Sequence, residues 1–300
     1  MTERLIVGTR RSRLARAQTE LVVRALVRRR PGIEFRIRPL TTSGDRDQRP
    51  GTSPDFTSEI DRELRSGGID LAVHSAKDLP ATPVPGLALA ACPRRADPRD
   101  CLVIGRSAGP RSLPKGARVG SSSLRRRAQL LRWRPDLRIV EVRGNVDRRL
   151  QRVRDGELEA AILAVAGLRR LGRTGEIGRI LPTSAFLPAP AQGSLAIMAR
   201  AGDRRAMEIA GSIDAATATA EVRAERAFAA ALGGDCRVPL GALARARGHR
   251  LVLVGEVLSP DGRIRLRCRA EGTVESPDRL GAGAAVRLLS HGADALLAPR

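Results

Sequence analysis

The chain has 300 residues, 42% of them hydrophobic but only 2% aromatic, so its length allows two or three domains with cores built from Ala, Leu, Val and Ile. The formal net charge is +22, yet only Lys77 and Lys115 among the 54 basic residues are lysines. Because the arginines are spread along the chain and aromatic side chains for stacking on bases are scarce, the charge favours an arginine-rich composition over a nucleic-acid-binding protein.

Other protein classes are excluded by what the sequence lacks. No run of 18 apolar residues is present, so no membrane-spanning helix is expected. The first residues, MTERLIVGTRRS, do not have the apolar core of an export signal, and we therefore expect a cytoplasmic protein. The cysteines at 92, 101, 236 and 268 form no CxxC pair and have no nearby His at ligand spacing, so neither a metal site nor a disulfide framework is expected.

In chain order, residues 3–40 predict a strand, a turn, a helix capped by Ser12, and a second strand after Pro31. Four apolar residues at helical spacing predict the buried stripe of that helix: Leu14, Ala17, Leu21 and Ala25. Residues 41–55, TTSGDRDQRPGTSPD, predict a long loop of the kind that often forms a lid. A helix within FTSEIDRELRSG and a strand within IDLAVHS follow.

A second block begins near residue 98 and repeats a strand–turn–helix pattern three times, which predicts a largely parallel sheet. After LPAPAQGSLAIMAR the chain returns to the first block, and a last segment predicts a helix, a hairpin around the turn 259–262 and a C-terminal helix. We therefore expect two α/β domains facing a cleft and a small α+β domain. Their ranges are 1–93 with 194–211, 99–188, and 216–300.

Polar residues gather after the predicted strands, where open α/β sheets bind their ligands. Five strand ends carry basic side chains: Arg10, Lys77, Arg125, Arg126, Arg143, Arg149 and Arg170. Hydroxyl groups stand among them, at Ser12, Ser75 and the run Ser121 to Ser123, and Asp78 is a carboxylate among these cations. Guanidinium groups bind carboxylates in a bidentate manner, so the pattern predicts a site for a small polyanion. The alternatives are solvated turn arginines and an Asp78 that only balances charge.

His74 and the cysteines have structural interpretations as well as functional ones. His74 lies inside an apolar strand, and we interpret it as a core histidine with its hydrogen bonds satisfied. Cys92, Cys101 and Cys268 lie in or beside strands and are predicted to be inert core thiols. Cys236 follows two glycines at the end of a helix, in LGGDCRVPLG, which favours an exposed thiol for covalent attachment over an incidental turn cysteine.

The order of the motifs resembles that of hydroxymethylbilane synthases, also called porphobilinogen deaminases, from Gly8 to Gly241. The segments are GTRRSRLARAQ, TTSGD, FTSEID, IDLAVHSAKDLP, VGSSSLRRRAQL, VRGNVDRRL, AAILAVAGLRRLG, PAPAQGSLAI, AERAF and LGGDCRVPLG. The resemblance implies two periplasmic-binding-protein-like (type II) domains and a third domain that presents the cysteine. It also implies a monomeric transferase of tetrapyrrole and haem biosynthesis. Such an enzyme adds four porphobilinogen units to a covalent dipyrromethane primer and releases the linear tetrapyrrole by hydrolysis.

The resemblance also implies a role for each matching residue. Cys236 would carry the dipyrromethane through a thioether, and Asp78 would be the catalytic carboxylate. The residues expected to hold the cofactor are Ser75, Lys77, Ser123, Arg125, Arg126 and Arg149. Those expected to hold the substrate are Arg10, Ser12, Arg143, Arg170 and Gln192.

Several positions depart from the family pattern. Ser53 and Ser58 stand where lid lysines are usual, and Pro190-Ala191 replaces an apolar residue followed by glycine in the hinge. These departures leave open a divergent paralogue that uses the same chemistry with another acceptor or fewer pyrroles. The net charge of +22 and the expected two-lobed cleft leave open a second alternative, a non-enzymatic basic binding protein.

Overall fold

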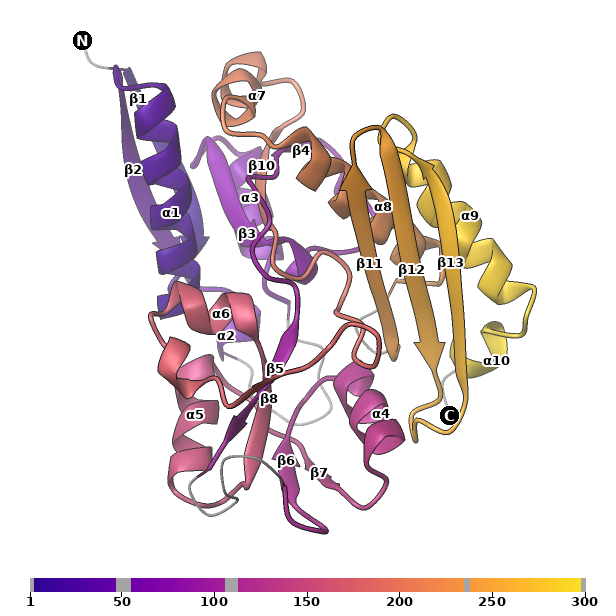
Figure 1. Cartoon of the computed structure of the whole chain (residues 1–300). Helices are drawn as coiled ribbons and strands as arrows, with labels where there is room; N and C mark the ends of the chain where they lie inside the picture. The colour runs from indigo at the N-terminus through magenta and orange to yellow at the C-terminus, as the bar shows by residue number, and fades with distance from the viewer. Residues whose placement is uncertain (1–2, 47–54, 106–112, 235–237, 298–300) are drawn as a thin grey trace.

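The computed structural model describes residues 3–46, 55–105, 113–234 and 238–297, with the side chains of residues 45 and 46 left out. Three sheets, each with its own helices, make up these residues, and we call each sheet with its helices a lobe (Figure 1). Lobes 1 and 2 have five strands each and lobe 3 has three. Within the described residues, no helix is both long enough and apolar enough to cross a bilayer.

Lobe 1 is a mixed sheet in the order β2-β1-β3-β10-β4. Its strands are β1 (Glu3–Arg10), β2 (Ile33–Leu40), β3 (Leu71–Ser75), β4 (Leu87–Ala91) and β10 (Leu195–Arg200). Its helices are α1 (Arg13–Arg29), α2 (Ser43–Arg46), α3 (Ser58–Arg65), the 3₁₀ turn η1 (Ala76–Asp78) and α7 (Arg204–Gly211). Strand β10 runs antiparallel to both of its neighbours, and the other strands are parallel.

Lobe 2 repeats this order as β7-β6-β8-β5-β9, with β5 antiparallel to its neighbours. Its strands are β5 (Asp100–Ile104), β6 (Arg118–Gly120), β7 (Arg138–Val140), β8 (Ala160–Ala164) and β9 (Arg179–Ile180). Its helices are α4 (Leu124–Trp133), α5 (Val146–Arg154), α6 (Val165–Arg170) and the 3₁₀ turn η3 (Thr174–Glu176). The antiparallel strand of each sheet is the one that the chain enters from the other lobe. This arrangement is the type II periplasmic-binding-protein topology, and the predicted parallel pairing of β6 with β7 and β8 is confirmed.

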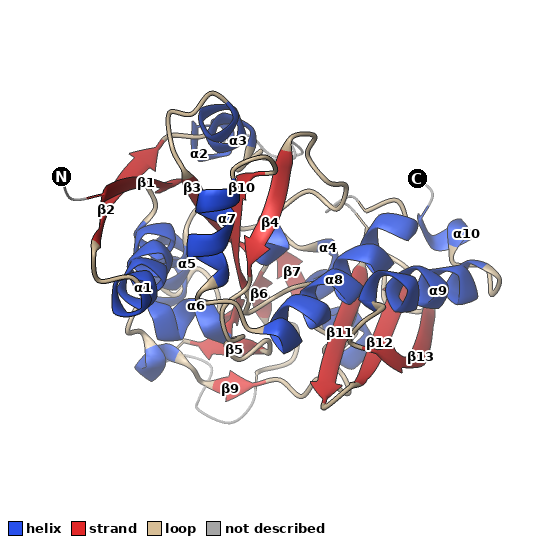
Figure 2. Cartoon of the chain, turned by 90° about the horizontal axis from the view of Figure 1, so that it is seen from above, coloured by secondary structure: helices blue, strands red, loops and turns tan. Residues whose placement is uncertain are grey.

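Lobe 3 is an antiparallel sheet with helices on one side (Figure 2). Its strands are β11 (Leu240–Arg247), β12 (Arg250–Leu258) and β13 (Arg265–Thr273), and its helices are α8 (Ala216–Ala231), α9 (Pro277–Leu289) and α10 (Asp294–Leu297). The hairpin predicted around the turn 259–262 is confirmed as β12 and β13. Strand β11 was missed by the sequence analysis. Phe228 of α8 is fully buried in the core between helices and sheet.

The predicted buried stripe of α1 was wrong by one position. Leu21 is 41% exposed, whereas Gln18, Thr19, Val22 and Leu26 are the buried residues of the helix. Two polar residues belong to the real stripe because their side chains find partners: Thr19 Oγ1 donates to the Ala15 carbonyl, and Gln18 reaches Ser75. Ser12 caps the helix as predicted, accepting a hydrogen bond from the Ala15 amide at 3.3 Å.

The two segments that connect lobes 1 and 2 are held against lobe 3 by a buried ion pair. Arg95 of the first connection donates to both carboxylate oxygens of Glu225 of α8, at 2.6 and 2.9 Å, and to the Gln192 carbonyl of the second connection at 3.0 Å. Glu225 also accepts from the amides of Ala191 at 2.5 Å and Ala244 at 2.7 Å. One carboxylate of lobe 3 thus fixes both connections.

Ala191 has a φ of 60°, in the left-handed region that favours glycine. This conformation costs an alanine about 1–2 kcal/mol. The family pattern noted above usually has a glycine at this position, and the backbone here has a conformation suited to glycine although the residue is alanine. The hydrogen bond from the Ala191 amide to Glu225 holds the strained residue in place.

Candidate active site

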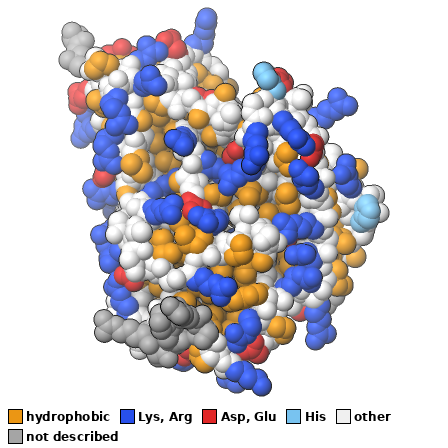
Figure 3. Space-filling model, viewed as in Figure 1, with side chains coloured by type: hydrophobic (Ala, Val, Ile, Leu, Met, Phe, Trp, Pro, Cys, Tyr) orange, Lys and Arg blue, Asp and Glu red, His pale blue; other side chains and the backbone are white. Residues whose placement is uncertain are grey.

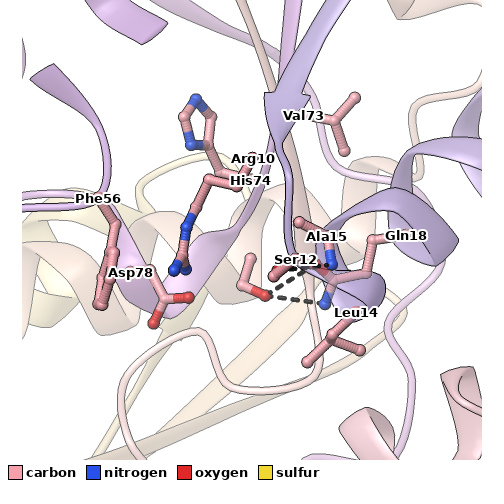
Figure 4. Close-up of a pocket in the computed structure, with 10 residues that line it drawn as sticks. Arg10, Ser12, Leu14, Ala15, Gln18, Phe56, Val73, His74 and Asp78 are labelled. Carbon is pink, nitrogen blue, oxygen red and sulfur yellow. Dashed lines mark hydrogen bonds between the residues drawn. The ribbon is translucent and has the colours of Figure 1, made fainter. Parts of the chain in front are cut away.

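A small pocket opens at the carboxyl ends of β1 and β3 in lobe 1 (Figure 4). Its lining includes seven polar or aromatic side chains: Arg10, Ser12, Gln18, Phe56, His74, Ser75 and Asp78. Arg10 ends β1, Ser75 ends β3, and Asp78 lies one turn further on in η1. The structure therefore brings together four residues predicted for the site from two separate strand ends, namely Arg10, Ser12, Ser75 and Asp78.

The side chains of this pocket are ordered by contacts with their neighbours. The guanidinium carbon of Arg10 lies 3.7 Å from the centre of the Phe56 ring, a cation–π contact. Ser75 Oγ lies 2.8 Å from the Gln18 side-chain nitrogen, which donates to it. Asp78 is exposed, and Figure 4 shows its carboxylate facing the same space as the Arg10 guanidinium and Phe56. A substrate could therefore meet a cation, an aromatic face and a carboxylate together.

His74 is buried, but the prediction that its hydrogen bonds are satisfied was wrong. Only 5% of the residue is exposed, and its Nε2 has no hydrogen-bond partner among the described residues. Burial, and then the charge of Arg10, lower the pKa of His74 to about 4. The imidazole is therefore neutral at physiological pH. A histidine that must stay neutral beside a cation can remain buried without an acidic partner.

A second group of residues surrounds the buried carboxylate of Asp100, at the start of β5. Arg125 donates to its Oδ2 at 2.9 Å, and Arg126 and the Gln192 amide donate to its Oδ1 at 2.7 and 2.9 Å. Lys77 Nζ lies 3.3 Å from the Gln192 side-chain oxygen. Although burial disfavours the charged form, Arg126 and Arg125 hold the pKa of Asp100 well below its usual range. The group joins Lys77 of lobe 1 to the arginines of lobe 2.

Arg125 and Gln192 are held mainly by other protein groups. Arg125 is 4% exposed, and besides Asp100 it donates to the Gln129 side chain and to the Leu187 carbonyl. Gln192 is 1% exposed and donates to the Pro98 carbonyl as well as to Asp100. That Arg125 and Gln192 bind the ligand therefore stays a prediction. Their observed contacts suit another role, which is to position Lys77 and Arg126.

The remaining predicted site residues lie on lobe 2, in the loops before α4 and α5, within α5, and at the end of α6. Ser123 caps α4 by accepting from the Arg126 amide at 3.4 Å. Arg149 donates to the Gly144 carbonyl and to Ser122 Oγ, and Arg170 donates to the Gly193 carbonyl at 2.6 Å. Arg143 pairs with Glu141 at 2.9 Å. The acceptors of Arg149 and Arg170 are neutral, unlike the carboxylate that faces Arg143.

Burial lowers the pKa of three of these cations. Burial, followed by the charge of Arg126, lowers the pKa of Lys77 to about 8 and that of Arg149 to about 10, and burial lowers the pKa of Arg170 to about 10. A bound anion would stabilise the charged form of each of these groups in place of the water that burial has removed. The arrangement therefore suits a ligand with several carboxylates, and dipyrromethane bearing acetate and propionate groups is such a ligand.

The predicted attachment residue, Cys236, lies outside the described residues. The other three cysteines are buried free thiols, as predicted. Burial raises the pKa of Cys92 and of Cys101 to about 12 and also raises that of Cys268, so these thiols stay protonated and unreactive.

Three residues of the site were not predicted from the sequence: Phe56, Gln18 and Asp100. Phe56 is one of only four phenylalanines and comes directly after the predicted lid, which was an available signal. Gln18 and Asp100 carried no such signal, because their partners are 57 and 25 or more residues away in the chain. Of the lid positions, Ser53 lies outside the described residues. Ser58 bonds through its amide and its hydroxyl to Asp55 at the start of α3.

Comparisons with known proteins show the family of the chain. The family model described as "Porphobilinogen deaminase, dipyromethane cofactor binding domain" matches residues 5–208, and "Porphobilinogen deaminase, C-terminal domain" matches residues 219–290. The chain belongs to the porphobilinogen deaminase family. The porphobilinogen deaminase of Roseiflexus sp. (strain RS-1) is 46% identical over 303 residues, covering 99% of this chain and 100% of that protein. Those of Rubrobacter xylanophilus and Thermus thermophilus are 46% and 43% identical and cover 99% and 98% of this chain, and 97% and 98% of the respective relatives.

Solved structures resemble the chain at a greater distance. The periplasmic VFT2 domain of Bordetella pertussis BvgS superposes with a TM-score of 0.41 at 18% identity, covering 70% of this chain and 86% of that one. The methionine binding protein MetQ superposes with a TM-score of 0.42 at 12% identity, covering 70% and 88%. The family assignment comes from the sequence matches alone.

Proposed function

We propose that this protein is a hydroxymethylbilane synthase, a cytoplasmic monomeric transferase that joins four porphobilinogen units on a dipyrromethane primer held by Cys236. The linear tetrapyrrole is then released by hydrolysis, and the primer stays on the enzyme. The observation that carries the proposal is the set of three half-buried cations, Lys77, Arg149 and Arg170, in a chain of this family, with the exposed carboxylate of Asp78 next to Lys77 in the sequence.

The cofactor would be held through its carboxylates. Lys77, Arg126 and Arg149 supply the positive charge, Ser75 and Ser123 supply hydroxyl groups, and Arg125 holds the buried side of Asp100. When bound, the dipyrromethane supplies the free pyrrole carbon from which the chain grows. A hydrogen bond to a charged partner contributes about 1.5–3 kcal/mol, so the loss of one such cation weakens binding markedly.

Asp78 would act on the incoming substrate. Porphobilinogen loses ammonia to give a cationic electrophile, and a nearby carboxylate stabilises that charge as it develops. The same carboxylate faces the pyrrole N–H and can take part in the later loss of a proton. The substrate's own carboxylates would be held or positioned by Arg10, which lies over the Phe56 ring, and by Ser12, Arg143, Arg170 and Gln192. Arg10 and Asp78 line the same pocket, so Arg10 can orient a substrate against the Asp78 carboxylate.

The proposal is tested on purified protein from cells that make haem. We expect a mass increase equal to one dipyrromethane on the peptide that contains Cys236, and we expect uroporphyrin I after incubation with porphobilinogen, acid and oxidation. A Cys236→Ser variant is the control and should lack both. If the wild-type protein is active but its Cys236 thiol is unmodified, the proposed attachment of the primer is wrong. If the thiol is unmodified and there is no turnover, the whole proposed function is wrong.

The two alternatives predict different results in the same assay. A paralogue that stops early or uses another acceptor would carry the added mass but give no uroporphyrin I. A nucleic-acid-binding protein would hold DNA at physiological salt, although non-specific phosphate contacts weaken steeply as salt rises. Figure 3 shows Lys and Arg scattered over this face of the molecule instead of forming one patch, which favours the small-molecule site.

The pKa of Lys77 predicts a pH effect on substrate binding. Because that pKa lies near 8 in the free protein, raising the pH through 8 removes a positive charge from the site, and the KM for porphobilinogen should rise. Lys77→Arg is the matched control, since a guanidinium stays charged over this range. We expect the KM of the variant to rise less between pH 7 and about 9.5. Parallel profiles for the two proteins would contradict the assignment to Lys77.

A further inference from the structure

A buried carboxylate of lobe 3 lies behind the arginines of the site. Glu256, on β12, has no exposed side-chain surface, and its Oε1 accepts from the Gln129 amide nitrogen at 2.6 Å. Its Oε2 has no hydrogen-bond partner among the described residues, and Arg267 approaches it only to 3.9 Å. A buried carboxylate that is incompletely paired destabilises the folded protein. The hydrogen bond that Glu256 accepts comes from lobe 2, which points to a role for this carboxylate between the two lobes.

From Glu256 a continuous chain of hydrogen bonds runs to the site. Gln129 of α4 accepts from Arg125 Nη1 at 3.0 Å, and Arg125 donates to Asp100 at 2.9 Å. Asp100 accepts from Arg126 and Gln192, and Lys77 contacts Gln192. Asp78 is the next residue along the chain from Lys77. Every link from Glu256 to Asp100 is buried, so water does not replace one of them easily.

The orientation of Gln129 is set by the acceptors around it. Its amide nitrogen lies 2.6 Å from Glu256 Oε1 and 2.9 Å from the Leu187 carbonyl, and both of these atoms accept hydrogen bonds. A carboxylate can only accept, so the Gln129 oxygen is turned toward Arg125, which can only donate. Asp100 pairs directly with Arg125 and Arg126, whereas Glu256 faces Arg267 at 3.9 Å and reaches Arg125 only through Gln129. Because one buried carboxylate is shared by two arginines, positive charge remains for the ligand at Arg126, Lys77, Arg149 and Arg170.

We propose that Glu256 is a positioning residue for the anion-binding cations: through Gln129 and Arg125 it fixes how Asp100 is shared with Arg126, and so aligns Arg126 and Lys77 for the carboxylates of the bound chain. The inference rests on the proposed function for the identity of that chain. It joins lobe 3, which would carry the primer, to the binding groups of lobes 1 and 2. Glu256 does not touch the ligand.

The test uses holoenzyme carrying Glu256→Gln, with Glu271→Gln as the control. Glu271 lies on the neighbouring strand β13, is 40% exposed and pairs with Arg250 and Arg269. We expect Glu256→Gln to raise the KM for porphobilinogen about fivefold while kcat stays within twofold, an effect of about 1 kcal/mol on binding. The control should leave both unchanged. Emission of Trp133, the single tryptophan, on the same helix as Gln129, checks that α4 stays in place.

A double-mutant cycle decides whether the effect passes through Gln129. Gln129→Met should raise KM by a similar factor, and the double variant should be no worse than the more affected single variant, because the two residues act in series. Additive effects, an unchanged KM, or a KM that falls because the site has become more positive would each overturn the inference. If Gln129→Met does not fold, the KM and kcat of Glu256→Gln decide alone.

A second measurement separates this inference from the proposed function. Calorimetry with benzenehexacarboxylate as a probe reports the hold on a polycarboxylate without any turnover. We expect its Kd to rise about fivefold in Glu256→Gln, in proportion to KM. Wild-type protein that bears no cofactor and produces no uroporphyrin would overturn the proposed function, whereas active wild-type protein with an unaffected Glu256→Gln variant would overturn only the role of Glu256.

Discussion

Asp78→Asn is expected to lower kcat at least about 100-fold while the protein stays folded, since the loss of one electrostatic group at a reacting centre has about this effect. Asparagine keeps the shape of the side chain but carries no negative charge to stabilise the cation formed when ammonia leaves. The KM should change much less, because the cations that bind carboxylates are untouched. Product formation is followed by the absorbance of the oxidised porphyrin.

The matched control for this prediction is Asp278→Asn. Asp278 lies on α9 in lobe 3, where it is 53% exposed and pairs with Arg223, so its loss should leave kcat unchanged. Thermal unfolding should show both variants close to the wild type. An Asp78→Asn enzyme with normal turnover would remove Asp78 from the chemistry and leave only the binding part of the proposal.

Glu225→Gln is expected to lower the free energy of unfolding by about 3 kcal/mol, the lower end of the range for breaking a buried ion pair. The variant leaves Arg95, whose side chain is only 4% exposed, with the single carboxylate of Glu221 at 3.3 Å. It also removes the negative charge that the amides of Ala191 and Ala244 approach. The shift of the urea unfolding midpoint measures the loss.

Glu208→Gln provides the comparison for that measurement. Glu208 pairs with Arg30 at 2.8 Å, but its side chain is 72% exposed, and exposed pairs contribute about 0–1 kcal/mol. We expect its midpoint to stay near that of the wild type. Equal midpoints for the two variants would show that the buried pair does not hold lobe 3 to the two connections.

Local patterns predicted most of the elements of this fold. Alternating strand and helix segments identified β6 with α4 and β7 with α5, and Ser12 and the turn 259–262 marked boundaries that the structure confirms. The face of α1 was misjudged because both of its sides carry apolar residues. Its true stripe depends on hydrogen bonds of Gln18 and Thr19, and the Gln18 bond needs a partner on β3.

The site was predictable only where chemistry gathers at strand ends. Arg10, Ser75 and Asp78 were found in this way, and the pocket brings them together. Asp100, Gln129 and Glu256 were not found, because a buried polar residue looks like any other until its partner is known. Glu256 lies 127 residues from Gln129, and spacing within the sequence carries no information about such a pair.

The fixed balance of charge around Asp100 has a consequence for product length. Under the proposed function every added unit brings two more carboxylates, while the protein's supply of nearby cations stays constant. The primer meets unsatisfied guanidinium and ammonium groups first, and each later unit meets groups that are more fully neutralised. Repulsion between the carboxylates of the oligomer therefore increases with each step. The chain is ready to be released once its negative charge exceeds the positive charge that the protein supplies.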